Sequence, residues 1–342
     1  MSRWFTVAWV AFLFSIPIWM TDLYFLHILI TTGIFTIAAI SLNLLLGYAG
    51  QLSLGHVAFF GIGAYTSALV SLGFDLEISD SYTLVFDPQP VWLAFVSGIF
   101  VSGLFGWFIG KIAFKVRGAY FVIVTISFAE VVRLISLNWI DLTEGPMALN
   151  NIPPFTLGVP GLWEQTFYQK IPNYYLVLVI TIIAYIIVRR LVLSRAGRAM
   201  IALRENEALA SSVGIDVTRY LILATIVASA IAGAAGGLYT HYIRIVDPDI
   251  FLFIYTVTMV IMVVTGGKGS LAGPVVGGII FGILPELLRE VASPEVQWII
   301  YGVFMIAIVF FLPKGIVPAL TAWWADRFKS DGHGGKAVRD SR

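Results

Sequence analysis

Residues 41–65 read SLNLLLGYAGQLSLGHVAFFGIGAY, and this stretch decides how the chain is built. Two apolar runs are interrupted by glycines and by the polar residues Asn43, Gln51 and His56. Glycine weakens a helix by up to about 1 kcal/mol relative to alanine, and in a bilayer the freed backbone groups need partners in protein or water. The stretch therefore predicts a membrane helix with a break, which either lines a polar path or packs closely against neighbouring helices.

The composition of the whole chain indicates an all-α polytopic membrane protein. Of its 342 residues, 59% are hydrophobic and 12% are charged, whereas soluble domains average about 25% charged residues. Uncharged runs of membrane-spanning length recur along the chain, and they lack the alternation of a transmembrane barrel. We expect about ten transmembrane helices, some of them short or broken, at residues 4–20, 23–46, 54–73, 91–110, 118–138, 174–192, 220–243, 251–265, 273–285 and 296–313.

The distribution of lysine and arginine predicts the orientation of these spans. With the N-terminus in the cytoplasm, seventeen of the 21 basic residues fall in predicted cytoplasmic segments, as the positive-inside rule requires. The C-terminus then also faces the cytoplasm, and loops 74–90 and 139–173 lie outside. The parity is unchanged if residues 251–285 re-enter the membrane from one side, so full crossing and re-entry both stay open.

We expect one transmembrane domain at residues 1–325 and a polar cytoplasmic tail at 326–342. The first apolar run follows Arg3 as in a signal peptide, but no small-residue cleavage site comes after it, so we interpret it as a retained span. The outside loop 139–173 is rich in proline and glycine and is predicted to form an ordered, irregular cap. The cytoplasmic segment 193–218 is too polar to cross the membrane.

A second glycine-rich stretch, TGGKGSLAGPVVGG at residues 265–278, has the same pattern as the first: an apolar run, a break and another apolar run. Paired breaks of this kind are a pointer to a transport site. The glycines of the two breaks are Gly47, Gly50, Gly55, Gly266, Gly267, Gly269 and Gly273. The residues that we expect along a substrate path are Asn43, Gln51, Ser53, His56, Phe59 and Phe60.

Two ionisable residues fall within the fifth predicted span, in VTISFAEVVRLIS. Glu130 and Arg133 are three residues apart, so they share a helix face and can form an ion pair. Charged side chains inside a membrane are costly and are functional candidates by default. A structural ion pair and a role in substrate or proton movement both fit this spacing.

The predicted cytoplasmic segment contains RRLVLSRAGRAMIALRENEALASSVGID, residues 189–216. An amphipathic helix on an anionic membrane surface is one interpretation. The acidic residues of ENEA and the good helix formers around them favour a helical element that docks on a partner protein.

Motifs for catalysis and metal binding are absent from the sequence. The chain has no cysteine, which excludes disulfides and thiolate metal sites, and its four histidines are scattered without an HExxH pattern. GGKGS is not a phosphate-binding loop, because Lys268 is followed by Gly269 and not by serine or threonine. A net charge of +1 suggests no nucleic-acid partner. We therefore expect no enzyme activity and no cofactor or metal bound by this chain.

Four blocks of the sequence, in this order, resemble LivM-type permease subunits of ABC importers for branched-chain amino acids. The similarity runs from about residue 23 to residue 315. The blocks are LNLLLGYAGQLSLGHVAFFGIGAYTSAL at 42–69, GAYFVIVTISFAEVVR at 118–133, GRAMIALRENEALASSVGID at 197–216 and TGGKGSLAGPVVGG at 265–278.

The resemblance implies a subunit of the bacterial inner membrane that passes hydrophobic amino acids across the lipid bilayer. It implies a second, LivH-like permease subunit, two cytoplasmic ATPases that use ATP and Mg²⁺, and a periplasmic substrate-binding protein. It also implies that residues 198–214 couple the permease to the ATPases, and the residues of this coupling loop are Arg198, Arg204, Glu205, Glu207 and Gly214. Urea or short amides are alternative substrates within this family. A secondary transporter with Glu130 as its ion-coupling acid is the rival from a different class.

Overall fold

The computed structural model describes residues 3–19, 22–79, 82–116, 118–159, 163–289 and 293–330. Apart from two short antiparallel hairpins and the connecting loops, this part of the chain is helical. A helix lies at each of the ten predicted spans. These helices are α1 (Arg3–Trp19), α2 (Leu23–Asn43), α3 (Val57–Leu72), α4 (Val91–Ala113), α5 (Ala119–Asn138), α7 (Lys170–Leu193), α10 (Val217–Ile243), α11 (Phe253–Gly266), α12 (Gly273–Arg289) and α13 (Pro294–Phe311).

Five segments within the described residues are long and apolar enough to cross a membrane: Leu23–Tyr48, Val91–Ala113, Tyr120–Asn138, Lys170–Leu193 and Val217–Ile243. Shorter apolar helices lie at Val57–Leu72, Phe253–Gly266, Gly273–Leu284 and Ile299–Ile308. The prediction of an all-α polytopic membrane protein is therefore confirmed. The number of full crossings stays a prediction, because α11 has 14 residues and is only about 21 Å long.

The first predicted break takes the form of a π-helical turn at the end of α2. The turn η1 (Leu44–Tyr48) continues α2 past the expected end at residue 46. The N–H of Ala49, the residue after the turn, donates to the carbonyl of Leu44 at 3.1 Å, a spacing of five residues. Single π-helical turns are found frequently at functional sites. The chain then runs without regular structure until α3 begins at Val57.

Helices α2 and α10 form the centre of the bundle. In their most apolar windows 78% and 72% of the residues are buried, against 22% and 28% for α5 and α7. Small residues allow the close packing around α10. A Cβ added to Gly63 of α3 would meet the backbone of Gly233 in α10, and one added to Gly236 would meet the carbonyl of Phe60.

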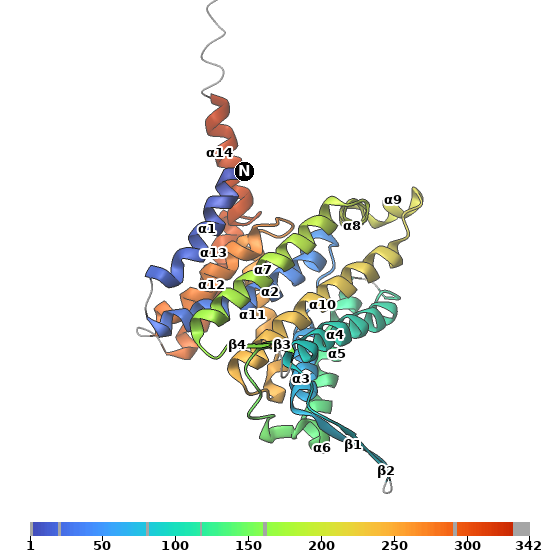
Figure 1. The fold of residues 1–342 in the computed structure, drawn as a ribbon. Helices are drawn as coiled ribbons and strands as arrows, with labels where there is room; N and C mark the ends of the chain where they lie inside the picture. Colours follow the sequence, from blue (N-terminus) through green and yellow to red (C-terminus); the bar gives the residue numbers. More distant parts are fainter. Residues whose placement is uncertain are drawn as a thin grey trace, which may run out of the picture.

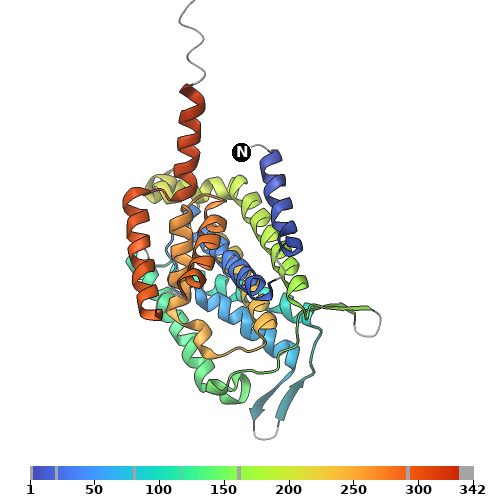
Figure 2. The same ribbon diagram turned by 90° about the vertical axis from the view of Figure 1, so that its left-hand side faces the viewer.

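The loops and the additional helices divide between the two ends of the bundle. One end carries α8 (Arg195–Glu205), α9 (Glu207–Ser212), α14 (Ile316–Ser330) and the start of α1, as Figures 1 and 2 show. The opposite end carries the hairpin of β1 (Phe74–Ser79) and β2 (Tyr82–Phe86), and also α6 (Ile140–Thr143). This division agrees with the sidedness that the basic residues predict.

The cap at residues 139–173 is more regular than the sequence suggests. It contains α6, the 3₁₀ turn η2 (Gly145–Met147), and a hairpin of β3 (Thr156–Val159) and β4 (Trp163–Thr166). The cap is fastened to the end of α10. His241 bonds to the carbonyl of Pro153 at 2.8 Å, and Arg244 donates to the carbonyl of Ile152 at 3.0 Å.

The last described helix lies at the boundary between the predicted domain and its tail. Helix α14 ends at Ser330, so it extends across the expected boundary at residue 325. Gly315, at φ 84°, precedes the helix, and Pro318 lies in its first turn, where proline is well tolerated. Residues 331–342 of the predicted tail, including His333, lie outside the described residues.

Candidate functional site

The two glycine-rich breaks, which are more than 220 residues apart in the sequence (|i−j| = 226), meet in the fold. The amide of Asn43 joins them. Its Oδ1 accepts from the N–H of Gly269 and its Nδ2 donates to the carbonyl of Ser270, both at 2.9 Å. Exchanging the amide oxygen and nitrogen would place like groups together, so these contacts fix the orientation of the amide. Asn43 is 1% exposed, which shields both hydrogen bonds from water.

Arg204 of α8 reaches the same place from the predicted coupling segment. Its Nη1 donates to the carbonyl of Gly47 at 2.6 Å, and its Nε donates to Glu205 at 3.1 Å. Gly47 lies at the C-terminal end of the helical run, where carbonyls lack partners within the helix. A cation at this end also interacts favourably with the helix dipole. Arg204 therefore connects α8 directly to the break after α2.

Only glycine fits at two of these positions. Gly50 has φ 72°, and a Cβ added to it would lie 3.2 Å from the Cα of Arg204. Gly269 has φ 74°, and its added Cβ would lie 2.7 Å from Nη1 of Arg204 and 2.8 Å from the carbonyl oxygen of Gly47. Side chains at either position would separate α8 from the breaks. We call this set the glycine junction: Asn43, Gly47, Gly50, Arg204, Gly269 and Ser270.

The other predicted glycines lie outside the glycine junction. Gly266 and Gly273 face each other across the turn between α11 and α12. Gly267, at φ 120°, packs against Pro318 at the start of α14. Gly55 packs against the backbone of Thr125 in α5. Gly214 has φ 88° and follows α9, with no atom within 4 Å of an added Cβ, so the conformation of the turn alone favours glycine there.

His56 is buried in the loop that leads into α3, at 0% exposure. Its Nε2 lies 2.7 Å from Oγ of Ser41, whose hydroxyl donates to the carbonyl of Ala38 at 2.6 Å. With that hydrogen donated to Ala38, Nε2–H of His56 donates to Ser41 and Nδ1 is left as an acceptor. Nδ1 has no hydrogen-bond partner among the described residues. Burying an acceptor without a partner is unfavourable, and Nδ1 of His56 is such an acceptor.

The remaining residues of the expected substrate path are mostly packed into the core. Ser53 is 1% exposed, and its hydroxyl has no partner within the described part of the chain. Phe59 and Phe60 are 2% and 1% exposed, and their rings contact Phe128 and Phe35. Gln51 alone is partly exposed. The role of these residues in a substrate path stays a prediction.

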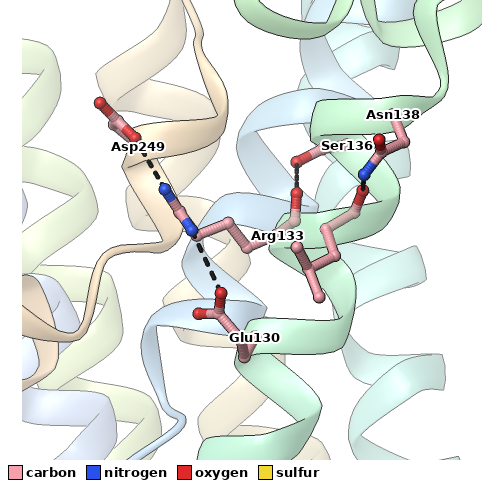
Figure 3. A network of polar contacts seen from close by, with 6 residues as sticks. Glu130, Arg133, Ser136, Asn138 and Asp249 are labelled. Atoms are coloured by element: carbon pink, nitrogen blue, oxygen red, sulfur yellow. Dashed lines mark hydrogen bonds and ion pairs between the residues drawn. The ribbon is translucent and has the colours of Figure 1, made fainter.

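Glu130 and Arg133 form an ion pair that extends to a second helix (Figure 3). Nη1 of Arg133 lies 3.1 Å from Oε1 of Glu130, and Nη2 lies 3.4 Å from Oδ1 of Asp249. Asp249 belongs to the 3₁₀ turn η3 (Pro248–Phe251), which precedes α11. The contact therefore ties α5 to the start of α11. It supports the structural interpretation of the pair and leaves a functional role untested.

The two carboxylates of this cluster are more exposed than the arginine between them. The side chains of Glu130 and Asp249 are 55% and 65% exposed, and that of Arg133 is 23% exposed. Half-exposed carboxylates facing lipid would be strongly unfavourable. This face of α5 is therefore expected to lie against protein or water in the membrane.

Helices α8 and α9 turn back at the end of α7 and are held by caps that the sequence encodes. Ser194 accepts from the N–H of Gly197 at 3.4 Å, and Asn206 accepts from the N–H of Leu209 at 2.9 Å. The segment is therefore helical, as expected. Leu209 and Val213 are 64% and 72% exposed on its outer side. Arg198 donates to the carbonyl of Leu193 at 3.2 Å, and Glu207 begins α9.

Some residues of the site were not selected from the sequence. Asp249 was missed, although an acid on the same predicted outer side as Arg133 was an available signal. Nothing in the sequence indicated that Ser41 contacts His56. Nothing in it indicated the contact of Ser270 with Asn43 either, because Ser270 takes part through its backbone carbonyl. Among the described residues, no three His, Asp or Glu side chains lie close enough together to hold a metal ion.

A bundle of apolar helices with polar breaks, and with a helical turn-back outside the bundle, is the architecture of a polytopic membrane transport protein. Comparison with known proteins identifies one family. Residues 24–309 match the model of the branched-chain amino acid transport system permease component. The chain belongs to this family, which confirms the resemblance seen in the sequence.

Individual relatives agree with this assignment. The chain is 30% identical over 305 residues to the high-affinity branched-chain amino acid transport system permease protein LivM of Salmonella typhimurium, covering 84% of this chain and 68% of that protein. It is 27% identical over 290 residues to LivH of Escherichia coli, covering 83% and 91%. It is 26% identical over 324 residues to a probable LivM of Methanocaldococcus jannaschii, covering 85% and 92%. No solved structure matches the chain.

Proposed function

We propose that the chain is the LivM-type permease subunit of an ABC importer that carries branched-chain, hydrophobic amino acids. The observation that carries the proposal is the contact of α8 with the glycine junction, because it links a docking segment to breaks in membrane helices. Exposed Leu209 and Val213 offer apolar surface for a partner. The names of the LivM and LivH relatives support the substrate class.

The proposed assembly contains three kinds of partner around this chain. A LivH-like permease completes the membrane part, and a periplasmic binding protein delivers the amino acid to the end that carries the cap. Two ATPase subunits bind and hydrolyse ATP with Mg²⁺ and contact α8 and α9. The chain itself transports and does not catalyse. We place it in the bacterial inner membrane.

We propose ten crossings with α8, α9 and both termini in the cytoplasm. Because the chain has no cysteine, single cysteines report orientation without background. We expect Gln89→Cys, exposed beyond β2, to react with a membrane-impermeant maleimide added to intact spheroplasts. Ser212→Cys, exposed in α9, should react only in inverted membrane vesicles. The reverse pattern would overturn the orientation.

The function is tested by purifying the complex with its partner subunits and measuring ATP hydrolysis in liposomes. Binding protein loaded with leucine, isoleucine or valine should stimulate hydrolysis and uptake, whereas urea and short amides should not. Stimulation by urea or an amide would show that these compounds, and not branched-chain amino acids, are the substrates. Uptake that continues without the ATPase subunits, and stops when the proton gradient is collapsed, would favour the secondary transporter instead.

A further inference from the structure

We propose that Asn43 and Arg204 are positioning residues that make the glycine junction one mechanical unit. Asn43 holds the two glycine breaks together, and Arg204 fastens both to α8. A displacement of α8 then moves the end of α2 and the turn between α11 and α12 at the same time. This inference rests on the proposed function, in which α8 and α9 receive motion from the ATPases.

The contacts of Asn43 favour a clamp over a substrate contact. Both polar ends of its amide are engaged by backbone groups of one short turn, at 2.9 Å each. A buried amide with both ends satisfied has little left to offer a passing amino acid. An added Cβ at Gly47 would also collide with Oδ1 of Asn43 and with the backbone of Gly269, so the two breaks touch without an intervening side chain. Asn43 therefore belongs to the junction and not to the surface of the path.

The position of Arg204 favours a link between elements over a simple helix cap. The guanidinium lies between the carbonyl of Gly47, at 2.6 Å, and Gly269 of the other break. Its aliphatic stem lies against Gly50. A cap contributed from within α2 would satisfy the helix end equally well. Instead the donor comes from α8, 157 residues away in the sequence. The hydrogen bond to Gly47 and the packing against Gly269 therefore connect α8 to both breaks.

The expected consequence is an uncoupled transporter. In the Arg204→Leu complex, leucine uptake per ATP hydrolysed should fall about tenfold, which is within the usual range of a coupling effect. Arg204→Lys keeps the charge and one donor, and it should restore part of the uptake per ATP. Arg219→Leu is the matched control, because Arg219 is exposed on α10 and its side chain makes no hydrogen bond or ion pair within the described part of the chain.

The clamp is tested in the same assay. Asn43→Ala removes both hydrogen bonds, and Asn43→Asp keeps the acceptor for Gly269 but places an oxygen against the carbonyl of Ser270. Both should lower uptake per ATP, by about fivefold or more. Thr32→Val is the control on α2, because the buried hydroxyl of Thr32 has no partner among the described residues. It should keep the wild-type ratio.

Two results would overturn the inference. One is an unchanged ratio of uptake to ATP hydrolysis in the Arg204 and Asn43 variants. The other is a loss of uptake and hydrolysis in equal proportion at equal amounts of assembled complex, which would assign these residues a merely structural role. A wild-type complex that branched-chain amino acids do not stimulate would instead refute the proposed function, so the two failures are distinguishable.

Discussion

Replacing Gly63 by alanine should lower the unfolding temperature of the detergent-purified chain. The added methyl group would enter the backbone of Gly233 in α10, and a backbone cannot rotate away as a side chain can. Helices α3 and α10 would have to separate, with a loss of about 3 kcal/mol in the free energy of unfolding. Thermal unfolding followed by circular dichroism measures the effect.

The matched control is Gly302→Ala in α13. An alanine Cβ at this exposed position meets no atom within 4 Å, and alanine is the better helix former by about 1 kcal/mol. Its unfolding temperature should equal or exceed that of wild type. If Gly63→Ala unfolds at the same temperature as Gly302→Ala, the close approach of α3 and α10 is wrong.

His241→Ala is expected to release the cap from the bundle. His241 is 2% exposed. Its Nδ1–H donates to the carbonyl of Pro153, which can only accept, so Nε2 accepts from the hydroxyl of Ser67, both at 2.8 Å. Alanine leaves the buried hydroxyl of Ser67 and the half-buried carbonyl of Pro153 unpaired, with a loss of about 3 kcal/mol in stability. Limited proteolysis should cut within residues 139–173 much faster than in wild type.

His27→Ala serves as the comparison at the same end of the molecule. His27 is part-buried and its Nδ1 makes one side-chain hydrogen bond, to Tyr242 at 2.7 Å. Its replacement should leave cleavage of the cap near the wild-type rate. Equal protection of the cap in the His241 and His27 variants would show that His241 does not hold it.

The helices were predictable from the sequence because their signals are local. Apolar runs of membrane-spanning length, and capping residues such as Ser194 and Asn206, specify where helices lie and begin. The predicted ends of helices were less accurate where the end is set by backbone geometry and not by composition. The π-helical turn extends α2 to Tyr48, and no composition rule distinguishes it from an α-helical turn.

The contacts of the site were not predictable, because they join segments far apart in the chain. The sequence marks both glycine breaks and Arg204 as candidates, but nothing in it pairs Asn43 with Gly269 or Arg204 with Gly47. Asn43 was expected on a substrate path, which stays a prediction, and the hydrogen bonds of its amide to backbone groups of the second break had no signal in the sequence. The hairpin of β3 and β4 was also missed, because four-residue strands carry too little periodicity to be recognised.

The glycine contact between α3 and α10 has a consequence for movement. Gly63, Gly233 and Gly236 bring backbone against backbone, so no long side chains interlock across this part of the interface. When one such helix slides along the other, few side chains at this contact have to change rotamer or leave a pocket on the facing helix. Small sliding of packed helices is the shear type of domain motion. Where these three glycines meet, the close contact between α3 and α10 is thus also a smooth one.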